Sequence, residues 1–448
     1  MQSQLYLVSL LIISVAVLLF LIMKLKLHAF VSLLIVSMLT AIAAGMPIQS
    51  IMGTIQSGMG GTLGFISVVV GLGAMFGQML EVSGGAERLA RTLIKSFGKD
   101  RAAWALGLAG FIISIPVFFD VGFIILVPLV YSLSKETKKS LLHYGIPLLA
   151  GLAVTHAFVP PTPGPVAVAQ LVGADLGKVI LFGIIAGIPA MIIAGPVFGK
   201  FIGERIYADI PEYMSFDDSI VTKDDKDLPS FSLIITLILI PIVLILLNTS
   251  ATVFLPEGNS LRNIASFIGH PFSALTIATV LAFVTLGKHK GLSREEVSKV
   301  ATAALAPTGL ILLVTGAGGI FKQVLTDSNI GKMLAEGLAS SSMNPIILAF
   351  LIATVVRVAA GSATVAMMTA GGIMAPLLPA FNVEPALVVI AIASGATVLS
   401  HVNDSGFWLV NRYFGISEKD TLKSWTVMET LIGIVGLISA LILSIFIK

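Results

Sequence analysis

Residues 400–406 have the sequence Ser-His-Val-Asn-Asp-Ser-Gly and lie in the middle of an apolar stretch. Between Pro385 and Asn411 the only formal charge is that of Asp404. A lipid bilayer cannot solvate such a group, so an ionisable residue inside a membrane segment is costly and usually belongs to a functional site. The meaning of this polar cluster therefore depends on whether the chain crosses a membrane.

The composition is that of a membrane protein. Of the 448 residues, 56% are hydrophobic and only 11% are charged, whereas soluble domains have about 25% charged residues. Apolar runs of about 18 residues or more recur, and each is long enough to cross about 30 Å of hydrocarbon. We therefore predict an all-α polytopic membrane protein with an N-terminal membrane repeat over 1–199, a cytoplasmic linker loop over 200–229 and a C-terminal membrane repeat over 230–448.

Several functional classes are disfavoured. The net charge of +3 is too small to indicate a nucleic-acid partner, and the absence of cysteine excludes disulfides and thiolate chemistry. No hydrolase pattern is present, so we expect no enzymatic activity, no cofactor and no metal site. The apolar run 5–23 is followed by Lys24 and Lys26, which indicates a retained first span and not a signal peptide.

About ten crossing spans are expected. Their predicted positions are 5–23, 28–46, 61–80, 144–171, 179–199, 230–249, 264–287, 300–321, 386–411 and 426–447.

Two further apolar tracts fit single spans poorly. The tract 102–133 is interrupted by Pro116 and Asp120, and the tract 345–379 by Arg357 and by glycines. Each is too long for one untilted helix and too short for two complete spans with a loop. Re-entrant hairpins fit both tracts, because such hairpins are tolerated where they are buried in protein or line a cavity.

The distribution of positive charge supports these hairpins. If both tracts return to their own side, most of the 27 lysines and arginines gather on one face, as the positive-inside rule requires for the cytoplasmic face. If each tract crossed once, this bias would vanish. The hairpin topology predicts a cytoplasmic 200–229 loop and both termini outside.

The two halves resemble each other at an offset of 245 residues. The matched pairs include Phe76 and Phe321, Gln78 and Gln323, Leu80 and Leu325, His156 and His401, Asp175 and Asp420, and Lys178 and Lys423. In the predicted topology the two copies have opposite orientations. Inverted repeats with discontinuous helices and a site near the midplane are typical of secondary transporters.

Four breaks in the apolar pattern are expected to meet in such an arrangement. They lie at 114–122, 155–165, 357–366 and 400–406. Four prolines occur between residues 160 and 165, and proline lacks the N–H that continues a helix. The unwound segments would present bare carbonyls and half-helix N-termini, and such N-termini attract anions.

Asp120 is the leading candidate for proton coupling, because an isolated carboxylate in a low-dielectric site binds a proton more readily than in water. It could instead cap the hairpin helix or pair permanently with Arg357. Asp404, His156 and His401 are further candidates for a proton site. The alternatives are that Asp404 caps a half-helix and that the two histidines are hydrogen-bonded structural residues.

Arg357 is the strongest candidate for substrate binding, because its planar guanidinium suits a carboxylate. It could instead be a snorkelling or permanently paired arginine. Hydroxyl and amide groups near the breaks suit a ligand that has many oxygen atoms. These further substrate-binding candidates are Thr155, Thr162, Ser362, Thr364, Ser400, Asn403 and Ser405.

The chain resembles the gluconate permease family of bacterial sugar-acid:proton symporters, nearly from end to end. The segments that carry the resemblance are His28-Ala29-Phe30, Gly-Gly-Thr-Leu-Gly-Phe at 60–65, the proline-rich break at 160–165, Gly-Ser-Ala-Thr-Val-Ala at 361–366, Ser-His-Val-Asn-Asp-Ser-Gly-Phe-Trp-Leu at 400–409 and Trp-Thr-Val-Met-Glu-Thr at 425–430.

The resemblance implies proton-coupled uptake of gluconate or a related sugar acid across the bacterial cytoplasmic membrane by alternating access. It also implies the fold of the wider ion transporter superfamily, with moving parts at 102–199 and 345–425 and the other spans forming a scaffold and a homodimer interface. Relatives often have glutamate where this chain has Asp120. D-serine, another small hydroxy or amino acid, or a carboxylate remains an alternative substrate, and sodium an alternative coupling ion. Arg357 and residues 401–404 favour the sugar-acid branch.

Overall fold

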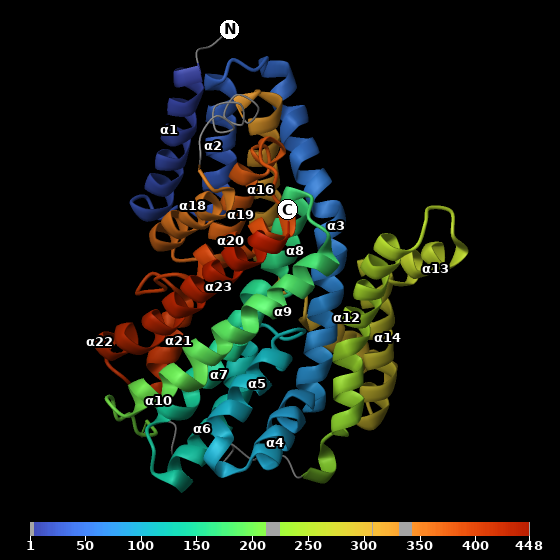
Figure 1. Cartoon of the computed structure of the whole chain (residues 1–448), viewed down its shortest axis with the longest axis vertical. Helices are drawn as coiled ribbons and strands as arrows, with labels where there is room; N and C mark the ends of the chain where they lie inside the picture. Colours follow the sequence, from blue (N-terminus) through green and yellow to red (C-terminus); the bar gives the residue numbers. More distant parts are fainter. Residues whose placement is uncertain (1–3, 212–224, 307, 331–342, 448) are drawn as a thin grey trace.

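The computed structural model describes residues 4–211, 225–306, 308–330 and 343–447. These residues form helices and no strand, so the prediction of an all-α membrane protein is confirmed at the level of fold class. Part of the predicted linker loop, residues 212–224, lies outside the described residues. Figure 1 shows an elongated molecule in which α3 runs along most of the length, with α12 and α14 on one side of it and α5 to α9 on the other.

The helices of the first half follow one another with short connections. They are α1 (Gln4–Met23), α2 (Ala29–Ala43), α3 (Ile48–Ser83), α4 (Gly85–Phe97), α5 (Ala102–Ile113), α6 (Phe119–Thr137), α7 (Leu141–Phe158), α8 (Pro163–Val172) and α9 (Leu176–Ile192), which continues through the π-helical turn Ile193–Val197 into α10 (Phe198–Gly203).

The second half repeats this order after its first helices. It contains α12 (Phe231–Phe254), α13 (Ser260–Ile268), α14 (Pro271–His289), α15 (Arg294–Ala303), α16 (Thr308–Asp327), α18 (Pro345–Ala360), α19 (Ala363–Met374), α20 (Pro385–Thr397), α21 (Ser405–Phe414), α22 (Glu418–Thr421), the π-helical turn Leu422–Thr426 and α23 (Val427–Phe446). In both halves a helix pair, a broken helix and a long helix with a π-helical turn follow in the same sequence.

Seven described helical segments are long and apolar enough to cross a membrane. They are Ile48–Ser83, Leu141–Val172, Leu176–Gly203, Phe231–Phe254, Pro271–His289, Thr308–Asp327 and Glu418–Phe446. Shorter apolar helices cover the predicted spans 5–23 and 28–46, the first part of the span 386–411 and the predicted hairpin tract 345–379. The tract 102–133 contains α5 and α6.

Two predicted spans start later than the sequence suggested. The span predicted at 264–287 begins at Pro271, because His270 ends the preceding turn and its Nδ1 accepts a hydrogen bond from the N–H of Phe272. The span predicted at 300–321 begins at Thr308, and the residues before it belong to the separate helix α15. Hydropathy could not separate these short helices from the spans that follow them.

Each predicted hairpin is a pair of helices with a short break. Helix α5 ends at Ile113 and α6 begins at Phe119, with Pro116 between them. Helix α18 ends at Ala360, and its C-cap Gly361 has a φ of 71°, which glycine adopts without strain. Ser362 then caps α19 by accepting the N–H of Val365 at 3.3 Å.

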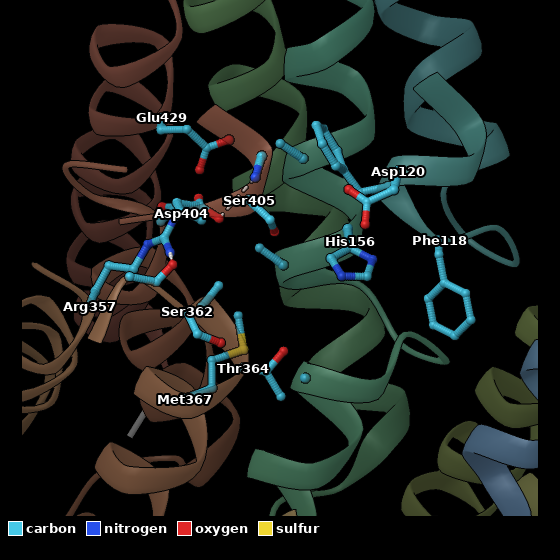
Figure 2. Close-up of a pocket in the computed structure, with 18 of the residues that line it drawn as sticks. Phe118, Asp120, His156, Arg357, Ser362, Thr364, Met367, Asp404, Ser405 and Glu429 are labelled. Carbon is cyan, nitrogen blue, oxygen red and sulfur yellow. Dashed lines mark hydrogen bonds and ion pairs between the residues drawn. The ribbon is translucent and has the colours of Figure 1, made fainter. Parts of the chain in front are cut away.

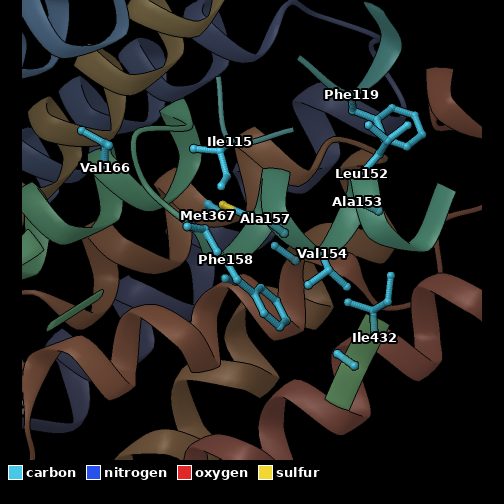
Figure 3. Close-up of a cluster of buried hydrophobic side chains, with 14 of the residues drawn as sticks. Ile115, Phe119, Leu152, Ala153, Val154, Ala157, Phe158, Val166, Met367 and Ile432 are labelled. Atoms are coloured by element: carbon cyan, nitrogen blue, oxygen red, sulfur yellow. The ribbon is translucent and has the colours of Figure 1, made fainter. Parts of the chain in front are cut away.

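The packed core surrounds α7, which is buried along nearly its whole length. Helices α5, α6, α9, α20 and α23 pack against it. Figure 3 shows Val154 and Phe158 of this helix among Ile115, Met367 and Ile432, which belong to both halves of the chain. The two halves therefore share one apolar core.

Small residues allow the close approach of α5 and α7. A Cβ atom at Gly151 would collide with the backbone of Gly107 and Phe111. Overpacking a well-packed core destabilises a protein by about 1–3 kcal/mol. The atoms that a Cβ at Gly151 would meet belong to the backbone, which cannot rotate away as a side chain can.

We therefore expect Gly151→Ala to destabilise the protein by about 1–3 kcal/mol, seen as a lower midpoint of thermal unfolding in detergent. Gly53→Ala is the matched control, because a Cβ atom at Gly53 meets nothing within 4 Å. Equal midpoints for the two variants would contradict the close packing of α5 on α7.

Candidate functional site

A cavity of about 530 Å³ lies where the four predicted breaks meet. Its size is within the range of small-molecule sites, about 300–1,000 Å³. Figure 2 shows its two walls, with Asp120 and His156 on one side and Arg357, Asp404 and Glu429 on the other. The predicted convergence of the breaks is therefore seen in the structure.

An ion pair between Arg357 and Asp404 dominates the second wall. Arg357 Nη2 lies 2.5 Å from Asp404 Oδ2, and the two side chains are only 3% and 14% exposed. Arg357 Nη1 also donates to the carbonyl of Gly361 at 2.5 Å. Asp404 Oδ1 accepts the N–H of Gly406 at 3.1 Å and thereby caps α21. Asp404 therefore caps α21, which was one of the two alternatives for this residue, and it also lines the cavity.

Ser400 fixes the Asp404 carboxylate from behind. Its Oγ donates to Asp404 Oδ2 at 2.5 Å and accepts the indole N–H of Trp425 at 2.7 Å. Thr426 donates to the carbonyl of Ser400. The π-helical turn before α23 therefore supports the broken segment through two side chains, those of Trp425 and Thr426.

The broken segment also binds the end of α18. The Nε2 of His401 lies 3.0 Å from the carbonyl of Val358, and Asn403 Nδ2 donates to the same oxygen at 3.0 Å. Carbonyls at a helix C-terminus have no partner within the helix, and these side chains satisfy them. Helix α18 and segment 400–404 are thus joined by an ion pair and by hydrogen bonds.

The opposite wall has fewer polar contacts. Asp120 lies in the first turn of α6, whose cap Phe118 has no side-chain capping bond. Within the described residues, its carboxylate has neither a hydrogen bond nor an ion pair, and the residue is exposed to the cavity. Asp120 therefore does not cap the hairpin through a hydrogen bond, and Arg357 pairs with Asp404 instead.

His156 lies on the same wall as Asp120. Figure 2 shows its ring below the Asp120 carboxylate. Its Nδ1 is buried without a hydrogen-bond partner in the described chain, and its ring meets that of Phe118 edge to face at 6.3 Å between centroids.

Polar groups that do not carry charge lie between the walls. Ser362, Thr364, Asn403 and Ser405 all line the cavity. Figure 2 shows Ser362 and Thr364 below the ion pair, beside Met367. Such hydroxyl and amide groups can donate to and accept from the hydroxyl groups of a ligand.

Four predicted residues do not line the cavity. His401 and Ser400 support it from behind, as described above. Thr155 is buried, and its Oγ1 has no hydrogen-bond partner in the described chain. Thr162 Oγ1 donates to the carbonyl of Val159 at 2.7 Å, within the break between α7 and α8.

The sequence interpretation missed Glu429. This residue lines the cavity and is 4% exposed. It is the single charged residue of α23, which is the same signal that singled out Asp120. In the sequence Glu429 belongs to the segment 425–430, which carries the family resemblance.

The described residues hold no group of three or more histidine, cysteine, aspartate or glutamate side chains able to bind a metal ion. The carbonyls of Val358 and Gly361, which an unwound segment could have offered to a cation, accept hydrogen bonds from protein side chains.

The ion pair predicts non-additive effects of mutation. Arg357→Ala leaves a largely buried carboxylate unpaired, which costs about 3 kcal/mol, and we expect a lower midpoint of thermal unfolding in detergent. Adding Asp404→Ala should restore part of this loss, because the unpaired charge is then gone. Lys99→Ala is the control, since its pair with Glu136 is exposed and should contribute less than about 1 kcal/mol. Strictly additive losses in the double variant would disprove the coupling.

Comparison with solved structures supports the fold. The chain is similar to MtrF of Neisseria gonorrhoeae, described as illuminating a class of antimetabolite efflux pumps, with a TM-score of 0.68, 14% identity, and coverage of 90% of this chain and 85% of that one. It is also similar to the YdaH transporter of Alcanivorax borkumensis, with a TM-score of 0.61, 14% identity and 89% coverage of both chains.

Sequence comparison gives the family. A gluconate permease of Pseudomonas aeruginosa is 42% identical over 452 residues and 99% of each chain. A low-affinity gluconate transporter of Escherichia coli is 44% identical over 96% of each chain. An L-idonate transporter of the same species is 38% identical over 95% of this chain and 96% of its own. The family model described as GntP family permease matches residues 6–446, and the chain therefore belongs to this family of membrane transporters.

Proposed function

We propose that the chain imports gluconate or a closely related sugar acid across the bacterial cytoplasmic membrane, together with protons, by alternating access. The observation that carries the proposal is the cavity between the two walls, which combines a guanidinium, a row of hydroxyl groups and carboxylates in one site. Several relatives at about 40% identity are named for gluconate, and one is named for L-idonate, which favours the sugar-acid class.

The arrangement of elements supports alternating access. Helix pairs and broken helices occur in the same order in both halves, as expected for inverted repeats with two re-entrant hairpins. In this topology residues 102–133 and 345–379 are the hairpins, the 200–229 loop is cytoplasmic and both termini are outside. The hairpin tips and the two helix breaks would then form the moving gate around the substrate.

The scaffold is proposed to consist of the helices farther from the cavity. Helix α14 packs against α3, and α12 packs against α14. Both helices expose apolar residues, such as Val243 and Leu247 of α12 and Val280 and Val284 of α14. Such a surface fits lipid and a homodimer partner.

Asp120 is the proposed coupling group. A proton on this carboxylate would remove a negative charge from the wall that faces Ser362 and Thr364 as the substrate anion enters. At the other wall the guanidinium of Arg357, held by Asp404, would attract the carboxylate of the substrate, and the hydroxyl groups of the cavity would bind the hydroxyl groups of the sugar acid. His156 lines the same wall as Asp120 (Figure 2) and is a further candidate for the proton site.

The proposal predicts uptake of labelled gluconate into proteoliposomes under an imposed inward proton gradient without sodium. Unlabelled sugar acids should compete strongly, and D-serine and citrate weakly. If uptake required sodium, the coupling ion would be sodium and not the proton. Inhibition by D-serine or citrate, with none by sugar acids, would assign another substrate class. Flux without saturation or counterflow would indicate a channel.

Asp120→Asn should abolish uphill accumulation, while gluconate counterflow between equilibrated compartments continues. The reason is that an amide keeps the size and polarity of the site but cannot release a proton. Asp100→Asn serves as the control, because Asp100 is exposed in the short helix before α5. Accumulation by the Asp120→Asn variant at the wild-type level would remove Asp120 from the coupling role.

A further inference from the structure

Glu429 is a buried acid on the cavity wall. It lies near the start of α23, lines the same cavity as Asp120 and is 4% exposed. Figure 2 shows its carboxylate on the same side of the cavity as Asp404 and Ser405. Among the residues described, its side chain forms neither a hydrogen bond nor an ion pair.

The neighbouring cation, Arg357, forms its ion pair with Asp404 and not with Glu429. Arg357 uses Nη1 for the carbonyl of Gly361 and Nη2 for Asp404. The hydroxyl of Thr430, the next residue along α23, donates to the carbonyl of Thr426 and accepts the N–H of Leu399. The Thr430 hydroxyl and the two terminal nitrogens of Arg357 therefore have other partners, and Arg357 Nε is buried without a hydrogen bond in the described chain.

The elements packed against α23 supply no second cation at this point. Helix α20 has no charged side chain. Lys178 of α9 pairs with Glu384 at 2.7 Å. Lys423, in the π-helical turn before α23, is exposed. The other charged or titratable groups on these elements are Arg357 of α18, and His143, Tyr144 and His156 of α7.

The formal charges of the cavity do not balance. Its wall holds the carboxylates of Asp120, Asp404 and Glu429 but one guanidinium, that of Arg357. The Arg357–Asp404 pair cancels itself, so two carboxylates remain without a counter-charge. A monovalent anion entering a cavity with two such charges would be repelled.

From this imbalance we infer that Glu429 is a second proton-carrying residue, and that the loaded site holds protons on both Asp120 and Glu429. The inference rests on the proposed function and adds a stoichiometry to it. Two protons and one monovalent anion enter together, and all three leave on the cytoplasmic side. Each cycle therefore carries one net positive charge inward, and uptake responds to membrane potential.

The test measures the potential at which net flux of labelled gluconate is zero, in proteoliposomes with equal pH on both sides and potassium–valinomycin potentials. For the wild type, a tenfold higher gluconate concentration inside should be balanced by about 59 mV, inside negative. For Glu429→Gln, one proton accompanies one anion, so the membrane potential should not shift the zero-flux point from equal gluconate concentrations.

Two further variants complete the test. Glu429→Asp keeps a titratable carboxylate and should retain the wild-type zero-flux potential. Glu418→Gln makes the same chemical change at an exposed position of the same continuous helix and should also retain it. Gluconate counterflow at zero potential shows that the Glu429→Gln protein is folded and binds substrate.

The outcomes separate the two proposals. A wild-type zero-flux potential for Glu429→Gln overturns the role of Glu429 and leaves proton symport intact. A wild type that is insensitive to potential but driven by a pH gradient overturns the two-proton stoichiometry alone. A wild type without gluconate uptake or counterflow overturns the proposed function, and with it the present inference.

Discussion

The ion pair between Arg357 and Asp404 is the interaction on which the second half of the site depends. A guanidinium that is 3% exposed is stable in an apolar bundle because a carboxylate lies 2.5 Å away. This pair joins the end of α18 to the start of α21. Ser400, Trp425 and the carbonyls of α18 complete the link. The helix pair α18 and α19 is therefore joined by polar contacts to the broken segment between α20 and α21.

The first half is built differently. Asp120 and His156 face the cavity from α6 and α7, and the described residues give the Asp120 carboxylate no fixed partner. One wall thus holds a compensated pair of charges together with Glu429, and the other holds Asp120 without a fixed partner among the described residues. In the proposed mechanism the guanidinium of the ion pair attracts the substrate anion, and the carboxylates without a partner carry the protons.

The apolar core explains how both walls keep their positions. Helix α7 carries His156 on the cavity side and packs its other faces against α5, α9, α20 and α23. The glycine contact between α5 and α7 brings their backbones together, so that the hairpin tip with Asp120 rests on a rigid neighbour. The site is therefore polar at its centre and held by close packing around it.

The sequence by itself determined the fold class, the breaks and most of the cavity-lining residues, because charges and prolines inside apolar runs are conspicuous wherever the solvent is lipid. Helix starts at Pro271 and Thr308 were misplaced, since hydropathy does not register short connecting helices. Only the tertiary structure decided which partner each charge has. It paired Arg357 with Asp404 and not with Asp120, placed His401 behind the wall, and brought Glu429 to the cavity. The physical reason is that a pairing depends on distances between helices far apart in the chain, and no local pattern encodes those distances.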